Sequence, residues 1–158
     1  MKLAIYTGAA IWISAHLWLL FFSSTVDPAL AVALPALGTF AMLIGTFGLS
    51  QRAEQPALRL SFAVLMAGMV LYILGVALTA LGAPNAAGIA ALGLLVITLA
   101  LLAVGIANIR ARLFGPFFWL PLAMGFVYLL SWAAPGGNTL MSIVYGFGWF
   151  ALGAKAHA

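Results

Sequence analysis

Six continuously apolar segments fill most of this chain, and short breaker sequences rich in Pro, Gly, Ser, Asn or charged residues separate them. Each segment approaches the length of about 20 residues that a helix needs to cross the hydrocarbon core of a bilayer. The first segment exceeds the roughly 7–15 apolar residues of a signal peptide, so we predict a membrane span there too. The predicted spans are residues 3–22, 29–50, 58–81, 87–109, 116–133 and 139–154.

The composition excludes a soluble fold. Of the 158 residues, 66% are hydrophobic and 5% are charged, whereas soluble domains carry roughly 25% charged residues. In hydrocarbon the backbone must satisfy its own hydrogen bonds, so only helices and closed barrels cross a membrane. Barrel strands alternate apolar and polar residues, and these segments are apolar throughout. The sequence therefore predicts an all-α integral membrane protein, with a single transmembrane domain over residues 1–158 built as a six-helix bundle.

The basic residues all fall on one side of a chain with six spans. Cytoplasmic connections are enriched in Lys and Arg, so we expect both termini in the cytoplasm and the protein in a bacterial cytoplasmic membrane. Five or seven spans would place the first and last lysines on opposite faces. The residues that determine this topology are Lys2, Arg52, Arg59, Arg110, Arg112 and Lys155.

The charge and the missing motifs exclude several functions. A net charge of +4 would suggest nucleic acid as a partner, but the basic residues form no cluster that would serve as a footprint. The chain has no cysteine, which rules out disulfides and thiolate metal sites. No predicted span carries Asp, Glu, Lys or Arg near its middle, and no HExxH, GxSxG or Walker motif occurs. We expect no enzyme, no metal and no nucleic-acid partner.

A weak internal repeat runs through the segments. Residues Gly45–Ala53 align with Gly148–Ala156, and Val70–Leu74 aligns with Phe126–Leu130. A period of roughly 50 residues would correspond to three tandem helical hairpins. Chance matching between apolar helices of biased composition is the alternative. With Gly148-Trp149 and Lys155 closing the last segment, the chain also resembles many small six-span bacterial proteins, a likeness that carries no site residue across.

His16 is the one ionisable side chain well inside a predicted span, and Trp12 precedes it by one helical turn. A buried polar group in lipid is expected to face a partner or a wet cavity. A neutral imidazole could hold a haem or chlorophyll-type pigment, relay a proton or hydrogen-bond a neighbouring helix. Packing through a hydrogen bond to a side chain or carbonyl is the structural alternative. His157 lies at the far end of the chain, which argues against two histidine ligands on one haem.

Other polar and aromatic residues are expected in the same half of the membrane as His16, where they could line a pocket with it. An aromatic belt at the membrane boundary would explain them equally well. These further pocket candidates are Tyr72, Tyr128, Ser131 and Tyr145, accompanied by Trp132, Asn138 and Ser142.

Three local features should shape the helices. Glycine and alanine recur along most segments, and small residues let membrane helices approach closely. Asn108 is expected to cap the fourth helix or to bond a neighbour. Pro121 should kink the fifth helix or lie in its first turn.

Three functional hypotheses remain open from the sequence. The first is a non-catalytic accessory or structural subunit that packs against membrane lipids and other membrane subunits, or against its own copies. The second is a small transporter or channel for an uncharged or lipophilic solute, with a pocket near His16. The third is a subunit of an electron-transfer complex that contacts a pigment or quinone through His16.

Overall fold

The structure is a computed structural model that describes residues 2–22, 28–133 and 138–155. Side chains are described for these residues except 28, 29, 32, 131–133, 138 and 155. Within the described ranges the chain is helical and contains no strand. The elements are α1 (Lys2–Phe22), α2 (Pro28–Ser50), α3 (Pro56–Ala80), α4 (Ala86–Ala111), a short 3-10 helix η1 (Gly115–Phe117), α5 (Leu120–Ala133) and α6 (Asn138–Lys155).

The all-helical prediction is confirmed. By length and composition, α1 to α4 are apolar enough to cross a membrane, while α5 and α6 are shorter apolar helices. The fifth helix begins later than the predicted residue 116, because Gly115 adopts a φ of +55° and a separate 3-10 turn follows. Pro121 consequently lies in the first turn of α5, where its missing N–H leaves no helical hydrogen bond unmade.

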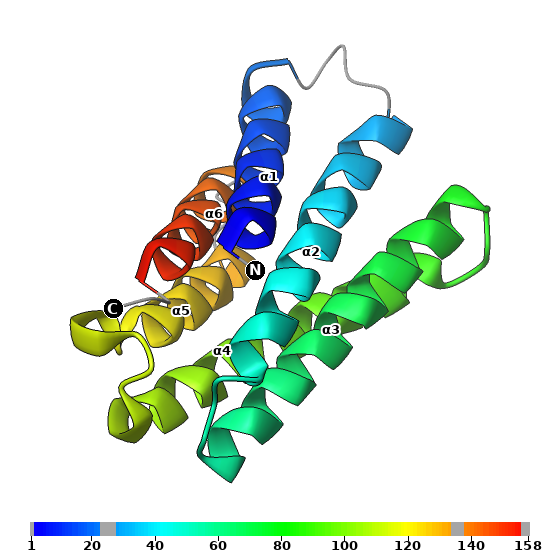
Figure 1. The fold of residues 1–158 in the computed structure, drawn as a ribbon. Helices are drawn as coiled ribbons and strands as arrows, with labels where there is room; N and C mark the ends of the chain where they lie inside the picture. The colour runs from blue at the N-terminus through cyan, green and yellow to red at the C-terminus, as the bar shows by residue number, and fades with distance from the viewer. Residues whose placement is uncertain (1, 23–27, 134–137, 156–158) are drawn as a thin grey trace.

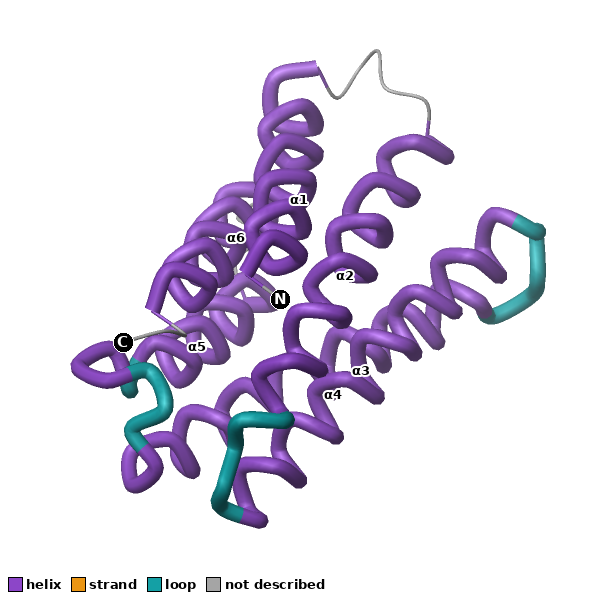
Figure 2. The backbone as a smooth tube through the Cα atoms, viewed as in Figure 1, coloured by secondary structure: helices purple, strands orange, loops and turns teal. Residues whose placement is uncertain are grey.

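The helices run alternately up and down, and each one packs against the next in the chain (Figure 1). Contacts between α1 and α6 join the first helix to the last, so the six helices form a closed ring in chain order. The tube in Figure 2 shows the connections α2–α3 and α4–α5 at one end of the helices. The start of α1 and the end of α6 lie at that same end, which we call the basic end because Arg52 and Arg110 lie there too.

Glycines lie where neighbouring helices touch. A Cβ on Gly8 of α1 would lie 2.6 Å from the carbonyl oxygen of Gly38 on α2. A Cβ on Gly68 of α3 would lie 2.8 Å from the backbone N of Ile97 on α4, and one on Gly105 would lie 2.6 Å from the backbone N of Leu122 on α5. Larger residues would force these backbones apart. The predicted use of small residues for close helix packing therefore holds at these crossings.

Asn108 holds the end of α4. Its side chain is fully buried. The Nδ2 group donates to the carbonyl of Phe118 at 2.9 Å, and Oδ1 accepts from the N–H of Leu113 at 2.8 Å. Two backbone groups in the α4–α5 connection thus obtain partners that the helix cannot supply. Of the two predicted roles, the side chain of Asn108 has the second, bonding a neighbouring segment, while the C-cap of α4 is Arg112, whose backbone N–H donates to the carbonyl of Asn108.

The outer surface is apolar on every helix. In water such a surface would be unfavourable, since large contiguous apolar patches mark contact with membranes or other proteins. Each helix contributes large exposed hydrophobic side chains, among them Phe21, Phe40, Leu60, Leu99, Phe126 and Phe147.

Candidate functional site

The predicted pocket residues meet around Trp12 of α1. The ring centroids of Trp12 and His16 lie 4.7 Å apart and the rings are stacked. The ring of Trp12 also packs against those of Tyr145 of α6 and Tyr72 of α3, with ring centroids 5.6 Å and 6.2 Å away. Residues that are far apart in the sequence therefore share one site.

The contacts continue into α5 and along α6. Tyr128 packs on Tyr145 with ring centroids 4.8 Å apart, and the rings of Tyr145 and Trp149 are nearly perpendicular with centroids 6.3 Å apart. The sequence predicted five of these residues as a group, and the side chain of the remaining candidate, Ser131, lies outside the described residues. We call this group the aromatic cluster: Trp12, His16, Tyr72, Tyr128, Tyr145 and Trp149.

The tautomer of His16 follows from its hydrogen bond. Nδ1 lies 2.9 Å from the carbonyl oxygen of Trp12, one turn earlier in α1. A carbonyl can only accept, so Nδ1 carries the hydrogen. In the neutral ring Nε2 is then the unprotonated nitrogen, and it has no hydrogen-bond partner among the described residues. His16 thus presents an acceptor beside the stacked indole of Trp12.

Two indole N–H groups differ in how they are satisfied. Trp12 Nε1 donates to the carbonyl of Ser142 at 2.8 Å and so joins α1 to α6. Trp149 Nε1 is buried and has no acceptor with hydrogen-bond geometry within the described part of the chain. The cluster thus keeps one unsatisfied donor in its interior, which is uncommon in folded proteins.

Two apolar grooves among the described residues are lined by neither His16 nor Tyr128. A groove of about 320 Å³ between α5 and α6 reaches Tyr145 and Met124. Another, of about 460 Å³, lies between α1 and α2 beside Ser14 and Trp18. The rings of the cluster instead pack on one another. In the part of the chain that the structure describes, no three His, Asp or Glu side chains come together as a metal would need.

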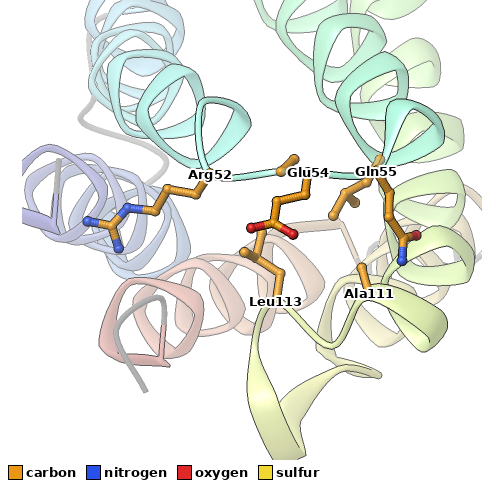
Figure 3. A pocket seen from close by; sticks show the side chains of 7 residues that line it. Arg52, Glu54, Gln55, Ala111 and Leu113 are labelled. Atoms are coloured by element: carbon orange, nitrogen blue, oxygen red, sulfur yellow. The ribbon is translucent and has the colours of Figure 1, made fainter.

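A second site lies at the basic end, and we call it the polar pocket. It is a cavity of about 260 Å³ between the α2–α3 connection and the end of α4. Figure 3 shows Glu54 directed toward Leu113 and Gln55 directed toward Ala111, while Arg52 extends the other way. Arg59 steadies this connection, because its Nε donates to the carbonyl of Ala53. The lining residues are Arg52, Ala53, Glu54, Gln55, Leu58, Ala111 and Leu113.

Sequence reasoning missed several members of these sites. Trp149 follows Tyr145 by four residues, and a helical period would have placed it on the same face. Glu54 is one of two acidic residues in the chain, and that rarity was the signal that it deserved a place among the candidates. Gln55 and Leu113 carried no such signal, because only the fold brings the α2–α3 connection against the end of α4.

Comparison with known proteins adds no assignment. No protein-family model, curated protein or solved structure matches this chain. The function is therefore inferred from the aromatic cluster, the polar pocket and the apolar exterior.

Proposed function

We propose that this chain crosses the cytoplasmic membrane of a bacterium six times, with both termini in the cytoplasm. The placement of the basic residues supports this topology, since Lys and Arg favour the cytoplasmic side. The beginning of α1, both basic connections and the end of α6 share one end of the helices. α5 and α6 are short for a span, so they would cross where the bilayer is thinned or where neighbours cover them.

Within that membrane the protein acts as a non-catalytic accessory subunit that packs against other membrane proteins. The single observation behind this proposal is how the aromatic cluster is filled. The rings of Trp12 and His16 stack, and the Trp12 N–H donates a hydrogen bond that joins α1 to α6. The outer face of every helix is apolar. Packing of this kind makes the interior rigid, and it leaves the outer faces of the helices as the surface that would bind other membrane proteins. A solute pathway through the cluster would need space beside His16 and Tyr128, and the α5–α6 groove is lined by neither.

Photo-crosslinking in native membranes tests the subunit proposal. A photoreactive amino acid replaces Phe47 or Phe147, whose side chains are 57% and 58% exposed. Met69 provides the matched control, because its side chain is fully buried. We expect crosslinks to a discrete membrane protein, or to a second copy of the chain, from at least one outer position and none from residue 69.

Native mass spectrometry of the protein extracted in mild detergent gives the complementary measurement. An oligomer or a stoichiometric complex is the expected species. A lone monomer, together with outer-position crosslinks to lipid only, would overturn the proposal.

A further inference from the structure

The polar pocket holds an acidic side chain whose charge is not used within the fold. Glu54 is exposed and forms no ion pair among the described residues, although Arg52 lies two residues before it on the same connection. Its carboxylate points toward Leu113, whereas the Gln55 carboxamide is directed toward Ala111 on the other side of the pocket (Figure 3). An ionised carboxylate only accepts hydrogen bonds. The pocket therefore offers acceptors to a cationic group with N–H donors.

The backbone around the pocket favours the same charge. Ala111 is the last residue of α4, and the final carbonyls of a helix are without intrahelical partners and carry partial negative charge. A primary ammonium group has three donors on a compact charge. It would donate hydrogen bonds to the Glu54 carboxylate near the negative pole of α4.

The size and position of the pocket point to a lipid headgroup. Its volume of about 260 Å³ is below the range of roughly 300–1,000 Å³ that is usual for drug-sized ligands. Apolar side chains of Leu58 and Leu113 form part of its wall. The pocket also lies at the ends of helices that are long and apolar enough to span a membrane. Groups at such an end meet the headgroup layer.

The contact that the structure supports is confined to Glu54, because the Arg52 side chain extends away from it (Figure 3). We propose that the polar pocket binds a phospholipid with a primary-amine headgroup, of the phosphatidylethanolamine type, with its ammonium at Glu54. This inference rests on the proposed membrane placement.

Lipid retention measures this site directly. The full chain is reconstituted in nanodiscs that contain equal amounts of phosphatidylethanolamine, phosphatidylcholine and phosphatidylglycerol, and lipids that stay bound are counted by native mass spectrometry. We expect phosphatidylethanolamine to be retained several-fold over the other two. Choline has no N–H donor for Glu54, and the glycerol headgroup has no positive charge. Equal retention of all three lipids would overturn the proposal, and this arm needs no variant.

Two variants locate the site. Glu54→Gln keeps the shape of the side chain and removes its charge, so we expect the several-fold preference for phosphatidylethanolamine to vanish, as the loss of one charge-assisted hydrogen bond implies. Arg110→Gln is the matched control. It also changes the charge by one at the basic end, but Arg110 does not line the pocket, and the preference should persist. An unchanged preference in Glu54→Gln, or the same loss in both variants, would contradict the site.

The amine has two further sources that the experiment separates. Soluble glycerophosphoethanolamine carries the same headgroup without acyl chains, and displacement of the retained lipid by a stoichiometric amount of it would assign the pocket to a soluble amine. In native membranes, a carbodiimide couples the Glu54 carboxylate to a nearby amine. If that amine is a protein lysine and not a lipid, the pocket would be assigned to a partner protein. Either outcome overturns the lipid proposal. Crosslinks from Phe147 are read independently, so the subunit proposal and the lipid proposal fail separately.

Discussion

At the residue scale, two neighbouring side chains of the aromatic cluster have different structural roles, which the sequence could not distinguish. Trp12 and His16 lie one turn apart on α1 and stack on each other. The hydrogen bond of Trp12 reaches across to α6, while that of His16 stays within its own helix. Trp12 therefore joins two helices, whereas His16 Nε2 has no hydrogen-bond partner among the residues that the structure describes.

Substitution of the two residues should reveal this difference. Trp12→Phe removes the side-chain hydrogen bond from α1 to the Ser142 carbonyl of α6 and leaves unfilled volume, so we expect a loss of about 1–2 kcal/mol in unfolding free energy. His16→Phe retains a stacked ring and loses a bond within α1, so the change should stay below about 0.5 kcal/mol. Unfolding of both variants in detergent micelles measures the two values. A larger cost for His16→Phe than for Trp12→Phe would contradict the assignment.

At the scale of helices, close approach at glycines determines the order of packing. Gly8→Ala would bring a methyl group within 2.6 Å of the Gly38 carbonyl oxygen and 2.7 Å of the Met42 N–H nitrogen, and neither backbone can give way without moving α1 from α2. We expect a loss of about 1–3 kcal/mol in stability, as overpacking typically costs. Gly88→Ala is the matched control because open space surrounds that position, and it should be neutral or more stable by up to about 1 kcal/mol. Thermal unfolding of the two variants tests the contrast, and equal stabilities would refute it.

The predicted hairpin repeat also belongs to this scale. Tyr72 and Tyr128 align in the sequence and both are buried in the aromatic cluster. Val70 and Phe126, two residues earlier, are exposed to the same degree, 50% and 51%. Helical periodicity would produce this match in unrelated helices as well, so the tandem repeat stays a prediction.

At the scale of the whole molecule, orientation can be measured with single cysteines because the chain has none of its own. Gln51→Cys places a thiol on the α2–α3 connection at the basic end, and Pro84→Cys places one on the α3–α4 connection at the other end. With a membrane-impermeant maleimide on intact cells, we expect labelling of residue 84 alone. Residue 51 should react only after permeabilisation. The opposite pattern would invert the proposed topology, and labelling of both in intact cells would contradict the span count.

The sequence by itself determined the class of the protein and most helix boundaries. Continuous apolar runs can satisfy their backbone only as helices in lipid, and the first four predicted segments end within two residues of α1 to α4. Local breakers mark such ends, because Pro and Gly act on the chain next to them. Only the start of the fifth segment was predicted wrongly, because Gly115 and the 3-10 turn precede α5, which begins at Leu120.

The sites were decided by the tertiary structure. Sequence spacing placed Trp12 beside His16, yet it could not show that Tyr72, Tyr145 and Trp12 meet, since those contacts depend on how the helices close into a ring. For the same reason the polar pocket was invisible: it exists only where the connection carrying Glu54 folds against the end of α4. Hydropathy reports how far each residue prefers lipid over water, whereas a site requires the mutual positions of several helices, which side-chain packing alone determines.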